Sequence, residues 1–254
     1  MSEPPRPTAP YRLSIVLPAF NEELNIVEAV TRATEAAERL CAEHEVVVVD
    51  DGSRDKTAEL VAGLADADPA IRLVRHARNR GYGDALRTGL RSARLDLVFF
   101  TDADNQFDFN ELELLLARID QADVVAGYRI KRQDRFARRL TARVWNQMVR
   151  ALFYVPVRDI DCAFKLFRRE VFDRIDIESV GAMVNTELMV KLGRSGAGVI
   201  EIGVSHYPRQ AGQARGATPR VVATALFELA RMYRRLSRAG APVTESPAEW
   251  QPRP

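Results

Sequence analysis

The sequence predicts an α/β fold, in which one domain is built on a doubly wound, mainly parallel sheet with helices on both faces. Two observations support this prediction. Short apolar runs alternate with segments of helical spacing along the first half of the chain, and this alternation is typical of parallel strands joined by helical crossovers. One run, residues 45–49, is nearly continuous in valine, as expected for a strand that is covered on both faces.

The first half contains five predicted strands and four predicted helices. The strands are 13–17, which ends before Pro18, then 45–49, 71–74, 95–100 and 123–126. The helices between them are 22–41, 56–64, 84–93 and 111–119. Asn21 directly precedes the first helix, and we expect it to act as the N-cap because its side chain can accept a backbone hydrogen bond there.

The second half is less regular. Its predicted elements are a basic helix at 136–153, a strand at 161–167, a helix at 185–194, a strand or hairpin at 199–207 and an amphipathic helix at 220–238. We expect residues 11–238 to form the single folded domain, with a first half at 11–128 and a second at 129–238. The two ends, 1–10 and 239–254, are rich in proline and are predicted to be disordered.

The composition is typical of a soluble globular protein, since 46% of the 254 residues are hydrophobic and 28% are charged. A net charge of +2 does not indicate a nucleic-acid partner. Basic residues nevertheless gather between Arg129 and Arg143, where seven of them stand against the single acid Asp134. Such a cluster is either a solvated helix face or a surface for an anionic ligand or a membrane.

Cysteine content and hydropathy indicate a location in the cell. Cys41 and Cys162 lie among apolar residues and far apart, so we expect buried thiols in a reducing compartment. No apolar run approaches the ~20 residues that span a bilayer, and residues 1–10 lack the apolar core of a secretion signal. The prediction is a cytoplasmic protein, with a peripheral position at the inner face of the cell membrane as the alternative.

Polar residues follow three of the predicted strands. Pro18-Ala19-Phe20-Asn21-Glu22 follows the first, Asp50-Asp51-Gly52-Ser53 the second, and Asp102-Ala103-Asp104 the fourth. Each motif alone has a structural interpretation, as a helix cap or a tight turn. Ligands of open α/β sheets bind outside the carboxyl ends of the strands, and buried carboxylates are costly without a cation or ligand. Three such ends therefore predict a binding site at this edge of the sheet, where a cation or a ligand uses the acids.

Two common nucleotide-binding signatures are absent from the sequence. No Gly-x-Gly-x-x-Gly follows the first strand, and no phosphate-binding loop of the Gly-Lys-Ser type occurs. The segment Asn79-Arg80-Gly81-Tyr82-Gly83 does place two glycines before a helix. We interpret this pair as an adaptation for tight packing between a strand and a helix.

Together these motifs resemble family 2 glycosyltransferases, which have the GT-A fold. The resemblance is carried by 17–22, 49–53, 79–83 and 102–106 and extends over residues 13–238. It is strongest to the polyprenyl-phosphate branch, which includes enzymes similar to dolichol-phosphate mannose synthase. The shared features there are 127–129, an arginine-rich helix, 158–165 and 206–209 followed by a glycine-containing loop.

The resemblance implies a role for each motif in an inverting, metal-dependent sugar transfer. It implies a first half that binds a nucleotide-diphosphate sugar of the GDP-mannose or UDP-glucose type, and a second half that faces the acceptor. The implied donor-binding residues are Pro18, Ala19, Asn21, Glu22, Asp50 or Asp51, Asp102, Ala103, Asp104, Arg209 and Arg215. The implied ligands of Mg²⁺ or Mn²⁺ are Asp102, Asp104 and Gln106. The implied catalytic residues are Asp104, Arg129, Glu187 and Asp161, and the implied acceptor-binding residues are Arg129, Arg138, Arg139 and Arg143.

Two acceptors remain open and require different chemistry. A polyprenyl phosphate at the membrane surface is already ionised at neutral pH and needs only to be held in line. A hydroxyl on a glycan or a small metabolite needs a general base, for which Glu187 or Asp161 is the best candidate. The sequence departs from the lipid-phosphate pattern at Ala142, where relatives often have serine, and at Arg215, where they often have lysine.

A third hypothesis is a non-catalytic protein that binds sugar nucleotides. The basic residues Arg209 and Arg215 argue against it, because a pure binder needs no cationic loop that closes over the donor. The amphipathic helix 220–238 is a candidate for contact with a membrane, although packing on the core explains its pattern equally well. The oligomeric state, the donor base and the sugar are not marked by any motif.

Overall fold

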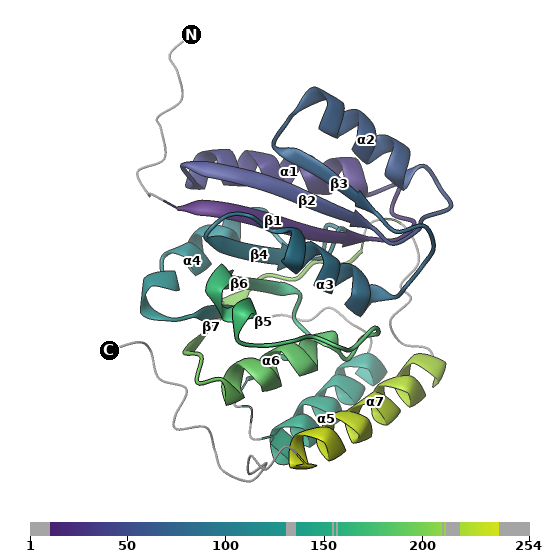
Figure 1. Cartoon of the computed structure of the whole chain (residues 1–254), viewed down its shortest axis with the longest axis vertical. Coiled ribbons are helices and arrows are strands. Elements are labelled where there is room, and N and C mark those ends of the chain that lie inside the picture. Colours follow the sequence, from purple (N-terminus) through teal and green to yellow (C-terminus); the bar gives the residue numbers. More distant parts are fainter. Residues whose placement is uncertain are drawn as a thin grey trace.

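The computed structural model describes residues 11–130, 136–153, 155, 157–209, 211 and 219–238, without the side chains of 136–143, 219–223 and 237–238. Within these residues the strands form one seven-stranded sheet of order β3-β2-β1-β4-β6-β5-β7 (Figure 1). The strands are β1 (Arg12–Ala19), β2 (Glu43–Asp50), β3 (Ile71–Arg75), β4 (Leu97–Thr101), β5 (Val124–Arg129), β6 (Phe164–Arg168) and β7 (Val199–Val204). Among the described pairs, β6 alone runs antiparallel to its neighbours. The predicted α/β, mainly parallel architecture is confirmed.

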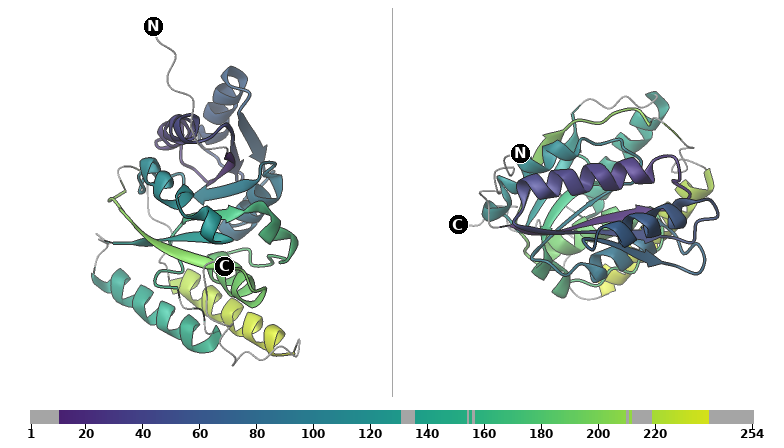
Figure 2. Two further views of the ribbon diagram at one scale, coloured as in Figure 1. Left: turned by 90° about the vertical axis from the view of Figure 1, so that its left-hand side faces the viewer. Right: turned by 90° about the horizontal axis from the view of Figure 1, so that it is seen from above.

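Helices cover both faces of the sheet, as predicted. The helices are α1 (Ile26–Leu40), α2 (Thr57–Ala67), α3 (Tyr82–Ser92), α4 (Leu112–Leu116), α5 (Phe136–Phe153), α6 (Val184–Arg194) and α7 (Pro219–Arg238). Helices α1 and α3 lie on opposite faces of β1 and β2 (Figure 2). Helix α1 packs beside α2, and α3 packs beside α6. The fold is therefore doubly wound, and the loops after β1, β2 and β4 meet at one edge of the sheet.

The core lies on both sides of the central strands. Valines 46–49 of β2 and every residue of β4 are buried, which confirms the interpretation of the valine run. Cys41 and Cys162 are also buried, as expected. Burial raises the pKa of both thiols to about 12, so neither ionises at neutral pH.

Pro18 does not end β1, contrary to the prediction. The strand continues through Pro18 to Ala19, with Pro18 opposite Val49 of β2. On its other side, β1 pairs with β4 only from Leu13 to Val16. Pro18 therefore occupies a local edge, where its missing N–H breaks no ladder hydrogen bond.

Asn21 does not cap α1, because the helix begins only at Ile26 after the N-cap Asn25. Asn21 instead has a left-handed backbone, with a φ of 53°. Its N–H donates to the Ser53 hydroxyl over 2.8 Å, and its side-chain oxygen accepts from the Arg54 N–H over 2.8 Å. Asn21 thus ties the end of β1 to the end of β2.

Two other predicted boundaries were wrong. The predicted helix 111–119 is divided into a 3-10 turn at Phe109–Glu111, the short α4 and a second 3-10 turn at Ile119–Gln121. The predicted strand 161–167 begins only at Phe164. The residues before Phe164 form a loop and not a strand. In this loop the carbonyls of Ile160 and Cys162 accept hydrogen bonds from the Lys165 ammonium, the first over 3.1 Å.

Helices α5 and α7 lie side by side next to α6 (Figures 1 and 2). Phe153 of α5 and Tyr233 of α7 place their ring centroids 6.0 Å apart. In α7, Leu229 is buried in the core, whereas Phe227 is 70% exposed, so one face of the helix packs on the core and the other exposes this phenylalanine among arginines such as Arg231 and Arg234. No helix among the described residues is long and apolar enough to cross a membrane.

Candidate active site

Asp102 and Asp104 follow β4 at the carboxyl edge of the sheet. The chain reverses at Asn105, which has a φ of 56°, and its side-chain amide donates to the Asn25 carbonyl over 3.1 Å. This bond anchors the turn to the start of α1. Asp104 is only 9% exposed and Ala103 only 2%. The sequence Asp102-Ala103-Asp104 is therefore a fixed turn that holds two carboxylates close together.

The two carboxylates share a site that disfavours two negative charges. Burial raises the pKa of Asp102, while the Tyr82 hydroxyl, Arg129 and Lys165 act in the opposite direction. Burial and the charge of Asp102 raise the pKa of Asp104 to about 7, against a lowering effect of Arg209. A cation bound between the carboxylates would remove this repulsion. The donor set thus fits a divalent ion.

Two carboxylates alone would leave most coordination positions of a divalent ion to water and other oxygen ligands. Among the described residues, no group of three or more His, Cys, Asp and Glu side chains could hold a metal. Mg²⁺ commonly binds through one or two carboxylates, water and substrate phosphates, and Mn²⁺ accepts the same oxygen ligands. Gln106 donates from its side-chain amide to the Tyr207 carbonyl over 2.9 Å, so its amide oxygen is the atom that can bind a cation.

Arg209 brings Glu22 and Asp104 together from distant parts of the chain. Its guanidinium donates to both carboxylate oxygens of Glu22 over 2.5 Å and to Asp104 over 3.4 Å. It also donates to the Ala211 carbonyl over 2.7 Å. These three predicted donor-binding residues therefore form one contiguous site. Arg215, predicted to act with Arg209, lies outside the described residues.

Asp50 and Asp51 at the end of β2 have different surroundings. Asp51 accepts from the backbone N–H groups of Arg80 and Gly81, each over 2.9 Å, and contacts the His76 ring nitrogen at 2.7 Å. Asp50 accepts from the Ser53 N–H over 3.1 Å, and its second oxygen lies 3.2 Å from the Arg75 guanidinium. The Asp51 carboxylate thus makes more contacts within the protein than the Asp50 carboxylate does. Asp50 therefore has more hydrogen-bond acceptor positions left for a ligand.

Tyr82 is a site residue that sequence reasoning missed. Its hydroxyl donates to Asp102 over 2.8 Å. Burial and the neighbouring Asp102 charge raise the pKa of Tyr82, so the hydroxyl stays protonated. The flanking Gly81 and Gly83 approach the backbone of 179–181, so the predicted role of this glycine pair in packing a strand on a helix was wrong. The motif 79–83 contains this tyrosine, but only its two glycines were assigned a role from the sequence.

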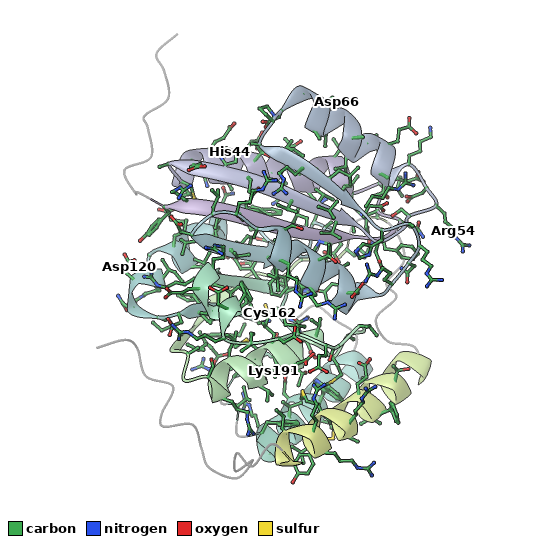
Figure 3. All side chains as sticks on the ribbon, in the orientation of Figure 1. His44, Arg54, Asp66, Asp120, Cys162 and Lys191 are labelled. Carbon is green, nitrogen blue, oxygen red and sulfur yellow. The ribbon has the colours of Figure 1, made fainter. Side chains whose placement is uncertain are left out.

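Glu187 is fully buried, and four donors contact its carboxylate. The N–H groups of Glu178 and Ser179 donate over 3.0 and 2.6 Å. The Lys191 ammonium on α6, labelled in Figure 3, lies 2.7 Å from the Glu187 carboxylate. The Arg235 guanidinium on α7 lies 3.3 Å from the same carboxylate. The carboxylate of this predicted base therefore anchors a loop and two cations.

Arg129 and Asp159 form a buried ion pair that the sequence did not reveal. The guanidinium of Arg129 donates two bonds to Asp159, over 2.6 and 2.7 Å. Burial opposes the charge of Arg129, but Asp159 outweighs this effect and raises its pKa. Burial lowers the pKa of the fully buried Lys165, while the charges of Asp159 and Asp161 act to raise it. Arg129, Asp161 and Lys165 thus belong to one charged cluster next to Asp102.

The predicted acceptor residues Arg138, Arg139 and Arg143 lie in α5, but their side chains lie outside the described residues. Pro18 and Ala19 are buried at the end of β1, where the Ala19 carbonyl accepts from the Asp51 N–H over 2.8 Å. The structure therefore gathers most of the predicted donor-binding residues at one edge of the sheet, around the acidic pair.

Comparison with known proteins agrees with this arrangement. The profile of glycosyl transferase family 2 matches residues 14–176. The chain belongs to this family. Family membership indicates a glycosyltransferase, and the resemblance inferred from the sequence motifs is confirmed.

Curated relatives of this family 2 member come from the polyprenyl-phosphate branch. An undecaprenyl-phosphate 4-deoxy-4-formamido-L-arabinose transferase from Enterobacter sp. (strain 638) is 29% identical over 84% of this chain and 64% of its own length. The protein of the same name from Pseudomonas aeruginosa (strain LESB58) is 33% identical over 85% of this chain and 63% of its own length. The chain thus spans slightly less than two thirds of these relatives.

Solved structures show the GT-A fold. Mannosyl-3-phosphoglycerate synthase from Rubrobacter xylanophilus matches with a TM-score of 0.70 and 21% identity, over 94% of this chain and 79% of its own. Glucosyl-3-phosphoglycerate synthase from Mycobacterium tuberculosis, solved with Mn²⁺, UDP and glucosyl-3-phosphoglycerate, matches with a TM-score of 0.63 and 23% identity. That match covers 91% of this chain and 81% of the other.

Proposed function

We propose that this family 2 member is a metal-dependent, inverting glycosyltransferase that moves a hexose from a nucleotide-diphosphate sugar to a polyprenyl phosphate. The names of the curated relatives support the acceptor class. The observation that carries the proposal is the pair of Asp102 and Asp104 in the turn after β4, in which Asp104 is buried and the charge of Asp102 helps to raise its pKa to about 7. We further propose that the protein works at the inner face of the cell membrane, where such a lipid is accessible from the cytoplasm.

The donor would bind along the ends of β1, β2 and β4. A divalent ion held by Asp102, Asp104 and the Gln106 amide oxygen would neutralise the charge that develops on the nucleotide-diphosphate leaving group. Arg209, already held beside Asp104, would add bidentate bonds to the diphosphate. The nucleoside would lie against Pro18, Ala19, Asn21 and Glu22, with Asp50 accepting from the base or ribose.

The lipid-phosphate acceptor is favoured by the surroundings of Glu187. Its carboxylate already accepts from two backbone N–H groups and contacts Lys191 and Arg235, so it is poorly suited to take a proton from a hydroxyl. A phosphate nucleophile needs no such base, only cations that hold it near the donor. Arg129 and the α5 arginines 138, 139 and 143 would supply these cations. Asp161 remains the base candidate for a hydroxyl acceptor.

Paired acceptors test this proposal directly. We would first screen nucleotide sugars by thermal shift with Mn²⁺, and then incubate the labelled donor that binds with a short polyprenyl phosphate or with the matching polyprenol. Glycosylated product from the phosphate alone, lost in EDTA, supports the proposal. Product from the alcohol or from a water-soluble hydroxyl overturns the acceptor class. Donor binding without any transfer indicates a non-catalytic binder.

A further inference from the structure

Tyr82 lies beside the acidic pair, and the proposed function leaves it without a role. It is the first residue of α3, and its hydroxyl donates to a carboxylate oxygen of Asp102 over 2.8 Å. We propose that Tyr82 is a positioning residue that fixes the Asp102 carboxylate in the orientation that binds the divalent cation. This inference rests on the proposed function, since it assumes a cation at Asp102 and Asp104.

One side of the turn before Tyr82 is held by Asp51. The carboxylate of Asp51 accepts from the N–H groups of both Arg80 and Gly81. His76 supports this carboxylate with one ring nitrogen, while its other ring nitrogen lies 3.0 Å from the Thr88 hydroxyl on α3. Asp51 therefore connects the end of β2 to the residue just before Tyr82, and the same helix holds His76 in place.

The other side of the turn is held by the backbone of 179–181. The Gly83 N–H donates to the Val180 carbonyl over 2.9 Å. A Cβ atom on Gly83 would lie 2.4 Å from the Ser179 carbonyl oxygen, and one on Gly81 would lie 2.4 Å from that of Val180. Gly81 also has a φ of 102°, a conformation that glycine adopts without strain. The two backbones therefore touch where the tyrosine ring leaves the chain.

The segment 178–181 is itself anchored, through Glu187. The Glu187 carboxylate accepts from the N–H groups of Glu178 and Ser179, and its own charge is balanced by Lys191 and Arg235. An unbroken series of contacts therefore leads from α6 and α7 through this segment to the Tyr82 turn. Contacts within the protein therefore fix the turn that carries the hydroxyl, as expected of a group that orients a ligand carboxylate.

A purely structural role would give Tyr82 a different behaviour. If the hydroxyl only satisfies buried polar atoms, its removal changes the melting temperature but leaves the affinity of the folded protein for a cation unchanged. If it orients Asp102, its removal weakens cation binding at a nearly unchanged melting temperature. Partners of a metal ligand typically contribute a factor of about 10–100 to metal affinity.

The test compares Tyr82→Phe with a matched control, Tyr11→Phe. Tyr11 also donates its hydroxyl to an aspartate, Asp120, over 2.9 Å. Figure 3 shows Asp120 on the opposite side of the molecule from Arg54, which follows the carboxyl end of β2. The control hydroxyl therefore lies at the other side of the molecule from the end of β2. The measurement is the dissociation constant of Mn²⁺, added alone and then with UDP or GDP, together with the melting temperature and nucleotide binding in EDTA.

We expect Tyr82→Phe to weaken Mn²⁺ binding about 10-fold, with nucleotide binding in EDTA unchanged and Tyr11→Phe equal to the wild type. Wild-type Mn²⁺ affinity in Tyr82→Phe overturns the inference. Should Tyr82→Phe not fold, Gly83→Ala keeps the hydroxyl but displaces the turn, and undiminished Mn²⁺ binding by that variant also overturns it.

Asp104→Asn separates this inference from the proposed function. When the wild type binds Mn²⁺, Asp104→Asn does not, and Tyr82→Phe equals the wild type, only the role of Tyr82 is refuted. When wild type and Asp104→Asn bind Mn²⁺ equally, or neither binds it, the cation site itself is refuted, and the role of Tyr82 is refuted with it.

Discussion

The guanidinium of Arg209 lies 3.4 Å from the carboxylate of Asp104, although 105 positions separate the two residues in the sequence. The same guanidinium contacts Glu22 at the end of β1. The guanidinium that we expect to bind the diphosphate therefore also neutralises two acids of the site. Changes at Arg209 or Asp104 should for this reason alter the affinity of the site for a cation, which can be measured.

Mn²⁺ affinity should increase as the pH rises through about 7. The pKa of Asp104 is raised to about 7, and the cation binds the ionised carboxylate, so protons compete with it below that pH. The check is calorimetric titration with Mn²⁺ between pH 5.5 and 8.5, in buffers of different ionisation enthalpy that count the protons released. Affinity that does not vary over this range contradicts the assignment.

Arg209→Ala should move this pH dependence to higher pH. Arg209 lowers the pKa of Asp104, so its removal lets the proton compete more strongly with Mn²⁺. The same titration measures the midpoint. Arg91→Ala is the control, because Arg91 also pairs with an aspartate, Asp176, but both side chains are more than 65% exposed. An unchanged midpoint in Arg209→Ala shows that Arg209 does not act on Asp104 in solution.

Asp104→Asn should bind no Mn²⁺ and yet be more stable than the wild type at pH 8 in EDTA. The folded pKa of Asp104, about 7, exceeds the ordinary value of 3.8. The folded state therefore holds an extra proton between these values, and the free energy of unfolding falls as the pH rises through this window. Asparagine carries no charge and avoids this loss, which is on the order of 4 kcal/mol.

Thermal melting checks this expectation, since about 1 kcal/mol corresponds to roughly 2–4 °C for a chain of this size. The difference between Asp104→Asn and the wild type should vanish below about pH 3, where the wild-type carboxyl is protonated in both the folded and the unfolded state. A variant that is less stable at pH 8 than at about pH 3, relative to the wild type, is the opposite result.

Glu187→Gln should destabilise the fold by about 3 kcal/mol, because it leaves Lys191 and Arg235 facing an uncharged amide in a buried position. Glu178→Gln is the matched control. Glu178 contacts the same two cations, but its side chain is 46% exposed, so its loss should cost less than about 1 kcal/mol. Chemical denaturation measures both values.

The activity of Glu187→Gln distinguishes anchoring from proton transfer. We expect its pH–rate profile to keep the wild-type shape below the melting temperature. If Glu187→Gln is as stable as the wild type and its pH–rate profile loses the acidic limb, Glu187 acts as the general base.

The sequence predicted the fold, and it predicted which polar residues gather at one sheet edge, because both depend on local patterns. The valines of β2 and the apolar run of β4 identify strands buried on two faces, and polar residues after such strands must meet at one sheet edge. Asp102, Asp104 and Glu22 were predicted for this reason. The family resemblance implied that Arg209 binds the diphosphate, but its contacts with Asp104 and Glu22 were not predicted and are not visible in the spacing.

The remaining features depend on contacts between distant segments. The interaction of Gly83 with Val180 joins residues far apart in the sequence, and no local pattern reports it. The partners of Arg129 and Glu187 were not predicted for the same reason. The sequence does not show whether the partner of a charged residue lies in the protein or in a ligand. The predicted strand end at Pro18 and the predicted helix cap at Asn21 were wrong because strand pairing and hydrogen bonds with the loop after β2 outweighed local propensity.

Strand β6, which comes late in the chain, lies between β4 and β5 and hydrogen-bonds to both. A cut between residues 128 and 129 would therefore leave an amino-terminal fragment whose last two strands have lost the partner that joins them. The two pieces should fold only when mixed, and the sheet offers no hinge about which one could swing against the other. Any opening and closing around the proposed sugar nucleotide would then come from the loops at the sheet edge.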